Sequence, residues 1–188
     1  MGVLIYAVSL GKLFSPYRFR QIQKDETTMD EAAIVCIDDQ RPVLASLERD
    51  LELLGPYFTF DFCESASEAE EVIENLYGKD IPVALIICDH IMPEKKGIEF
   101  LSEMREDSRV ENARKILLTG LADQKDTILA INQGGVNFYI EKPWEKEHLI
   151  KTVQIQLTHF LVGAGFEYTQ FMPAVDQETL YKLLQSST

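Results

Sequence analysis

The chain has 188 residues, of which 46% are hydrophobic and 26% are charged, and its formal net charge is −13. This length suits one domain with extensions, and the acidic balance argues against a nucleic-acid-binding protein, which would need a basic face. No stretch reaches the ~18 apolar residues of a membrane span, and Cys36, Cys63 and Cys88 lack a disulfide spacing, so we expect free thiols and a cytoplasmic protein.

Residues 1–30 are expected to form an N-terminal tail outside the domain. An apolar run over residues 3–10 is followed by four cations, with only Asp25 and Glu26 opposing them. A signal-like segment would carry basic residues before the apolar run and a small-residue cleavage site, and both are lacking. If translation starts at Met29, the tail is an artefact of the gene model; a partner-binding helix is the second alternative. We favour a disordered tail or a gene-model extension.

Between residues 31 and 160, short apolar runs alternate with helical patterns, which indicates five βα units. Strands are expected at about 33–37, 58–63, 83–88, 115–119 and 137–140. Helices are expected to begin at Pro42, at a Ser65–Glu68 capping box, at Gly97, after Asp123 and near Trp144. Units of this size predict a flavodoxin-like doubly wound α/β fold, a five-stranded parallel sheet in the order 2-1-3-4-5 with right-handed crossovers.

Residues 161–188 are expected to form a C-terminal extension with a short helix. Gly163 and Gly165 interrupt the preceding helical pattern, and Asp176 is placed to cap a helix around Leu180. We expect the extension to fold back on its own domain; a dimer contact or a link to an output partner is the alternative. About 28 residues are too few for a DNA-binding or catalytic output domain.

Polar side chains follow four of the five predicted strands: Asp38 and Asp39, then Asp89, Thr119 and Lys142. Ligands of such sheets bind beyond the carboxyl ends of the strands, so we expect these groups to converge. Three crowded carboxylates are costly without a cation, and hard oxygen ligands suit Mg²⁺. Lys142 suits a phosphate oxygen, Thr119 offers a hydroxyl, and Asp89 is the candidate phosphoryl acceptor at the end of the central strand.

This pattern resembles the receiver domain of the two-component response regulator family, over about residues 31–160. The matching segments are Val35-Cys36-Ile37-Asp38-Asp39 with Pro42, Cys88-Asp89-His90-Ile91-Met92-Pro93 with Gly97, Leu118-Thr119-Gly120, and Tyr139-Ile140-Glu141-Lys142-Pro143-Trp144. They include every active-site position of the family pattern.

The resemblance implies a phosphorylation site that depends on a metal. Asp89 would accept a phosphoryl group from a histidine kinase or phosphotransfer protein. Asp38, Asp39, Asp89 and the backbone carbonyl of Ile91 would hold Mg²⁺, and Lys142 would bind the phosphoryl oxygen. The protein would not be an enzyme in the ordinary sense, since it would catalyse only its own phosphorylation and dephosphorylation.

The resemblance also implies a switch. Thr119 and Tyr139 would move on phosphorylation and re-present the face made by the fourth helix, the fifth strand and the fifth helix to a downstream protein, whose identity the sequence does not reveal. The same face would serve a homodimer. The peptide bond between Lys142 and Pro143 is expected to be cis.

Each of these polar residues also has a simpler role that it could play alone. An Asp pair after a strand is commonly a helix cap, and a lysine is commonly a surface charge. As a set, the residues fit either the phosphorylation switch or a phosphate-independent interaction or scaffold module of the same fold. A hydrolase that forms an aspartyl phosphate would need a second carboxylate two positions after Asp89, where the chain has Ile91.

Overall fold

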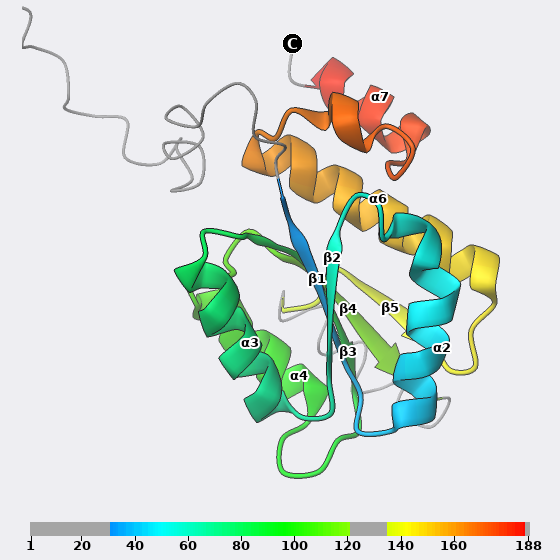
Figure 1. Cartoon of the computed structure of the whole chain (residues 1–188). Coiled ribbons are helices and arrows are strands. Elements are labelled where there is room, and N and C mark those ends of the chain that lie inside the picture. Colours follow the sequence, from blue (N-terminus) through cyan, green and yellow to red (C-terminus); the bar gives the residue numbers. More distant parts are fainter. Residues whose placement is uncertain (1–30, 121–134, 187–188) are drawn as a thin grey trace, which may run out of the picture.

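The computed structural model describes residues 31–120 and 135–186. Their five strands form one parallel sheet in the order β2-β1-β3-β4-β5, which confirms the predicted doubly wound fold (Figure 1). The strands are β1 (Ala33–Ile37), β2 (Thr59–Cys63), β3 (Val83–Asp89), β4 (Arg114–Thr119) and β5 (Phe138–Glu141). The helices are α2 (Arg41–Leu51), α3 (Ala66–Gly78), α4 (Gly97–Glu106), α6 (Lys146–Ala164) and α7 (Gln177–Ser186), with short 3₁₀ turns η1 (Glu52–Leu54) and η3 (Tyr168–Phe171).

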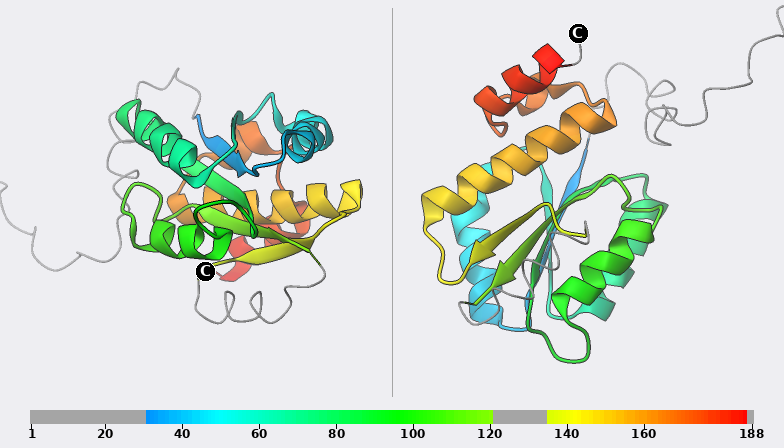
Figure 2. Two further views of the ribbon diagram at one scale, coloured as in Figure 1. Left: turned by 90° about the horizontal axis from the view of Figure 1, so that it is seen from below. Right: turned by 180° about the vertical axis from the view of Figure 1, so that it is seen from behind.

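Helices cover both faces of the sheet, α2 and α6 on one face and α3 and α4 on the other (Figure 2). Successive side chains of a strand point to opposite faces, and β1 shows this alternation. Ile34 and Cys36 belong to the core under α2 and α6, whereas Val35 and Ile37 belong to the core under α3 and α4. Both faces of the central strands are therefore dry.

The central strands β1 and β3 are more continuously apolar in sequence than the edge strands, because both of their faces are buried. Every residue of β1 and β3 is buried, so each reads as a continuous apolar run up to its final residues. The edge strands β2 and β5 each leave residues exposed or half-buried. A polar residue at the end of β1 or β3 therefore stands out, and Asp38 and Asp89 occupy these positions.

The helix starts follow the predicted caps. The Ser65 hydroxyl accepts a hydrogen bond from the Glu68 backbone N–H at 3.2 Å. The Glu68 carboxylate accepts in return from the backbone N–H of Glu64 at 2.6 Å, one residue before the expected position. The predictions for residues 1–30 and for the helix capped by Asp123 lie outside the described residues.

Three predicted boundaries need correction. β3 continues through Asp89, which pairs with Leu118 of β4, and β5 is shifted one residue towards the C-terminus. α6 passes through Gly163 and ends at Gly165, which adopts the left-handed conformation with φ of 76°. The helix therefore runs across the boundary at residue 160. No helix in the described ranges is both long and apolar enough to cross a membrane.

The C-terminal segment packs against α6, as expected for an extension that folds back (Figure 2). Phe171 is buried, and its ring stacks on Phe58 at a centroid distance of 5.1 Å and meets Phe166 edge-on at 6.1 Å. Leu180 of α7 joins the same core cluster as the inner residues of α2 and α6. The extension is thus continuous with the core on this face of the sheet.

Asp176 links the C-terminal segment to α6 through hydrogen bonds and an ion pair. Its carboxylate accepts from the backbone N–H of Thr179 at 3.0 Å and pairs with Lys151 of α6, while its own N–H donates to the Thr158 hydroxyl at 2.9 Å. Burial would raise the pKa of Asp176, but the hydrogen bonds from Lys151 and Thr179 outweigh it and hold the pKa below its ordinary value.

The three cysteines are buried free thiols, as predicted. Burial raises the pKa of Cys63 to about 12, and it also raises the pKa values of Cys36 and Cys88. Thiols that stay protonated are weak nucleophiles and poor metal ligands, so we assign all three to packing.

We expect Asp176→Ala to lower the free energy of unfolding by about 1–3 kcal/mol, because it removes both the cap of α7 and the ion pair to α6. A carboxylate with a lowered pKa stabilises the fold above its unfolded-state pKa of about 3.9 and loses this effect as the pH falls through the lower folded-state value. The difference from wild type should therefore be constant at neutral pH and shrink below about pH 4. Urea titrations at several pH values measure it.

Glu178→Gln provides the control, since it breaks only the exposed pair with Lys182 on α7. An exposed helix pair of this kind contributes less than about 0.5 kcal/mol. Equal losses in the two variants would show that Asp176 does not fasten the extension.

Candidate functional site

The carboxylates of Asp38, Asp39 and Asp89 meet at the carboxyl ends of β1 and β3. One ligand oxygen from each lies within 4.8 Å of the others. β1 and β3 are neighbours in the sheet, and Ile37 pairs with Cys88, so the residues that follow them come out side by side. The tertiary structure thus brings together residues 50 positions apart in the chain.

Lys142 neutralises two of these carboxylates. Its Nζ atom lies 2.6 Å from Asp38 Oδ2 and 2.6 Å from Asp89 Oδ1. Burial raises the pKa of Asp89, while Lys142 opposes this effect. Burial also tends to lower the pKa of Lys142, but its hydrogen bonds to Asp38 and Asp89 outweigh this and raise it. The ammonium is therefore charged at neutral pH.

One buried oxygen of the Asp39 carboxylate indicates that this cluster is a candidate cation site. Asp39 Oδ1 is buried and has no hydrogen-bond partner among the described residues, although a buried acceptor normally has one. Both oxygens of Asp38 have partners, because Oδ2 contacts Lys142 and Oδ1 accepts a hydrogen bond from the Gln40 backbone N–H at 3.0 Å. Three carboxylates with an unpaired oxygen between them fit a hard divalent ion such as Mg²⁺, which accepts oxygen ligands and retains water.

The two proposed switch residues differ in their surroundings. Thr119 is 4% exposed at the end of β4, and its carbonyl accepts from the Lys142 backbone N–H at 2.8 Å. Tyr139 is 45% exposed on the edge strand β5, where its ring stacks on Phe138 at a centroid distance of 6.1 Å. The structure therefore places Thr119 at the site and Tyr139 on the outer surface.

The loop between Asp89 and α4 is closely held at Gly97. The Gly97 N–H donates to the carbonyl of His90 at 2.9 Å. A Cβ atom at Gly97 would lie 1.9 Å from the Asp89 carbonyl oxygen, so only glycine fits. Ile91, two residues after Asp89, is 53% exposed.

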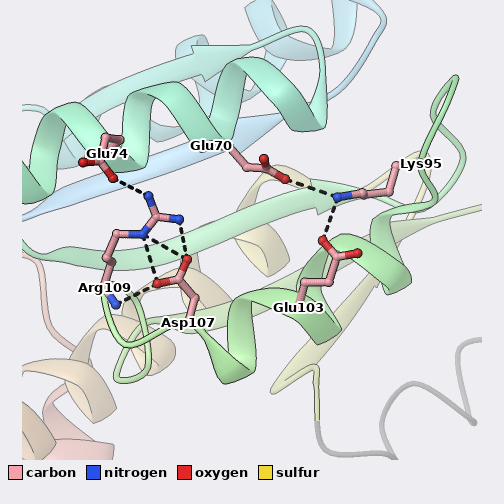
Figure 3. A network of polar contacts seen from close by, with 6 residues as sticks. All are labelled: Glu70, Glu74, Lys95, Glu103, Asp107 and Arg109. Atoms are coloured by element: carbon pink, nitrogen blue, oxygen red, sulfur yellow. Dashed lines mark hydrogen bonds and ion pairs between the residues drawn. The ribbon is translucent and has the colours of Figure 1, made fainter.

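A pair of ion networks connects this loop and the end of α4 to α3 (Figure 3). Lys95 Nζ contacts Glu70 of α3 at 3.2 Å and Glu103 of α4 at 2.6 Å. Further along, Arg109 contacts Glu74 of α3 and Asp107, both at 2.5 Å. Sequence reasoning missed Lys95, because no spacing rule links it to residues 25 and 8 positions away.

A groove of about 530 Å³ lies beside Lys142, between α2 and the segment before α6. Its lining includes Pro42, Arg49 and Trp144, and the Trp144 indole donates to Asp50 at 3.1 Å. The peptide bond between Lys142 and Pro143 is cis, as the resemblance predicted. The groove therefore lies directly beside the acidic cluster and its lysine.

The structure thus combines a parallel doubly wound sheet with an acidic cluster and a lysine at the carboxyl ends of its strands. Residues 34–154 match the family described as response regulator receiver domain. The chain belongs to this family, the receiver domains of two-component response regulators, as its motifs indicated.

The chain is similar to a transcriptional regulatory protein and to a chemotaxis protein. The chain is 35% identical over 124 residues to the hydrogenase transcriptional regulatory protein HoxA of Cupriavidus necator, a match that covers 66% of the chain but 24% of that protein. It is 27% identical to the chemotaxis protein CheY1 of Helicobacter pylori, with 66% of the chain and 95% of CheY1 covered. The chain therefore spans about a quarter of the first relative and nearly all of the second.

The fold is shared with solved receiver domains. A signal receiver domain of an HD domain-containing protein from Pseudomonas fluorescens is 27% identical, with a TM-score of 0.59 over 72% of this chain and 99% of that one. A receiver domain protein from Methanospirillum hungatei, at 23% identity and a TM-score of 0.58, shares the fold over 71% of this chain and 97% of that one.

We expect Gly97→Ala to destabilise the domain by about 1–3 kcal/mol, because the new methyl group overlaps the backbone of Asp89. Gly78→Ala is the matched control, since a Cβ atom there meets nothing within 4 Å. The control should be neutral or slightly stabilising. Equilibrium unfolding in urea compares them, and equal stabilities would contradict the close approach at Gly97.

Proposed function

We propose that the protein is a phosphorylation switch in which Asp89 accepts a phosphoryl group from a histidine kinase or phosphotransfer protein. The observation that carries this proposal is the joint contact of one ammonium with Asp38 and Asp89, beside the lone oxygen of Asp39. A phosphoryl acceptor needs nearby positive charge and metal ligands, and this site offers both. Membership of the receiver domain family supports the same function.

Mg²⁺ would be held by Asp38, Asp39 and Asp89, with the backbone carbonyl of Ile91 as a further ligand. When bound, it supplies positive charge that offsets the charge on the transferred phosphoryl group. The three carboxylates provide the hard oxygen donors that this ion prefers. Asp39 gains a partner for its buried oxygen, which is a reason for the chain to keep a carboxylate there.

In the transfer step an Asp89 carboxylate oxygen attacks the phosphorus of a phosphohistidine. The new bond joins oxygen to phosphorus, the bond from phosphorus to the imidazole nitrogen breaks, and that nitrogen keeps the electron pair. Lys142 stays within reach of Asp89 and donates to a phosphoryl oxygen. Two residues after Asp89, the apolar Ile91 would limit access of water to the product.

The response would pass through Thr119 and Tyr139. The Thr119 hydroxyl donates weakly to the Gly120 carbonyl at 3.3 Å, so a phosphoryl oxygen offers it a stronger acceptor. Gly120 leaves space around the loop, since a Cβ atom there meets nothing within 4 Å. Tyr139 and Phe138 present aromatic surface on the edge strand, next to His148 of α6. Such a surface suits a protein partner or a second copy of the chain.

Two relatives support the signalling context by their names. The chain is 29% identical to a hybrid signal transduction histidine kinase D of Dictyostelium discoideum and 28% identical to a sensor histidine kinase CheAY of Helicobacter pylori, in each case over part of that protein. We propose a cytoplasmic location, which the three free buried thiols support. We propose that the domain catalyses only its own phosphorylation and dephosphorylation.

Incubation with Mg²⁺ and acetyl phosphate, followed by intact-mass analysis, tests the acceptor. We expect a phosphoryl adduct on the wild-type chain and none on Asp89→Asn, because the amide is not a nucleophile of this kind. Omitting Mg²⁺ should also abolish the adduct. An unmodified wild type that also fails to bind beryllofluoride would favour the phosphate-independent scaffold module instead.

The lysine is tested by Lys142→Met. We expect adduct formation to slow by about tenfold or more, since a single charged donor to a transferring group is commonly worth this much. Mg²⁺ binding, followed by the fluorescence of Trp144, should be retained because the three carboxylates remain. Lys146→Met, which removes an exposed charge at the start of α6, is the matched control. Equal rates in the two variants would contradict a role for Lys142.

A further inference from the structure

The loop between β3 and α4 is tied to two helices by one side chain. Lys95 Nζ lies 3.2 Å from Glu70 Oε1 of α3 and 2.6 Å from Glu103 Oε2 of α4 (Figure 3). The hydrogen bond to Glu103 raises the pKa of Lys95 and, with the bond to Glu70, outweighs the effect of burial, so the ammonium is charged at neutral pH. One cation therefore holds the loop against two helices that pack on the same face of the sheet.

The backbone just before Lys95 adopts a conformation that residues with a side chain rarely take. Glu94 has φ of 69°, and the Lys95 N–H donates to the Pro93 carbonyl across it at 2.8 Å. A three-residue turn with a positive φ at its centre is the rare and strained form of this turn. Such a conformation persists where surrounding contacts enforce it, and the two ion pairs of Lys95 act on the adjacent residue.

The same loop carries two groups of the proposed metal site. Asp89 stands at its start, and the backbone carbonyl of Ile91 is the proposed further ligand of Mg²⁺. Upstream of Ile91, the His90 N–H donates to a backbone carbonyl of β4 at 2.8 Å. Downstream, the chain passes through the buried Met92 into the turn that Lys95 holds. The placement of the Ile91 carbonyl thus depends on anchors on both of its flanks.

The ion pairs of Lys95 are partly open to water. The Lys95 side chain is 30% exposed, and those of Glu70 and Glu103 are 43% and 54% exposed. Partly exposed pairs contribute little to the free energy of unfolding of a whole domain. The effect of Lys95 is therefore expected on the local placement of the loop and not on global stability.

We propose that Lys95 is a positioning residue for metal binding, which holds the loop so that Asp89 and the Ile91 carbonyl are arranged for Mg²⁺ before the ion arrives. The inference rests on the proposed function, because it concerns the same site. Lys95 would act through the backbone of residues 91–95 and not by contact with the ion.

Lys95→Gln tests this inference with Mg²⁺ alone, in a titration of the full chain followed by Trp144 fluorescence and without a phosphodonor. We expect the dissociation constant for Mg²⁺ to rise by about fivefold, less than the ~10–100-fold effect typical of a direct hydrogen-bond partner of a metal ligand. Charge alone predicts the opposite sign, since removal of one cation near three carboxylates favours binding of another. A rise in the constant therefore reports the placement of the loop.

Two further variants complete the comparison. Lys96→Gln removes the same charge from the exposed neighbouring residue and should leave the constant unchanged or slightly lower. Lys95→Arg keeps a cation with enough donors for both carboxylates and should bind Mg²⁺ within about twofold of wild type. In EDTA, hydrogen exchange at the Gly97 amide should be about threefold faster in Lys95→Gln than in wild type, because a local anchor is lost.

The possible results separate this inference from the proposed function. Wild-type affinity in Lys95→Gln, or equal weakening by Lys96→Gln, would overturn the inference alone. A lowered urea midpoint for Lys95→Gln without rescue by Lys95→Arg would assign the residue to global stability and also overturn it. A wild-type chain that binds no Mg²⁺ would overturn the proposed function, and this inference with it.

Discussion

The ion pairs from Lys142 to Asp38 and Asp89 hold the functional end of the sheet together. They join residues that follow β1, end β3 and follow β5, so one ammonium connects three strands. Two carboxylates from neighbouring strands would otherwise face each other in a region shielded from water, where repulsion between like charges is strong. Thr119 ends β4, the strand between β3 and β5, so these ion pairs span its position.

The loop after Asp89 is held by a different kind of constraint. Gly97 brings the first turn of α4 against the Asp89 backbone, and the Lys95 ammonium draws the loop towards both α3 and α4. Close packing at one point and ion pairs at another leave Ile91 exposed between them. The buried Asp89 thus lies two residues from an exposed apolar side chain.

Charge is divided between the two ends of the strands. The carboxyl end gathers acids around one lysine, whereas β4 begins with two cations, Arg114 and Lys115, that donate to neutral acceptors. The C-terminal segment adds to the core rather than to the acidic cluster, because Phe171 and Leu180 pack with residues from α2 and α6. The extension therefore enlarges the core on the face of the sheet covered by α2 and α6.

The sequence by itself determined the order of the strands, the residues at their carboxyl ends and the cap at Asp176, because apolar runs and turn residues encode local structure. Periodicity could not tell that α6 passes through Gly163, since packing against the sheet and α7 overrides the weak helix preference of glycine. Only the tertiary structure decided which charges meet. The pairing of Lys95 with Glu70 and of Lys142 with Asp38 depends on how strands and helices far apart in the chain are placed, and no spacing in the sequence records that.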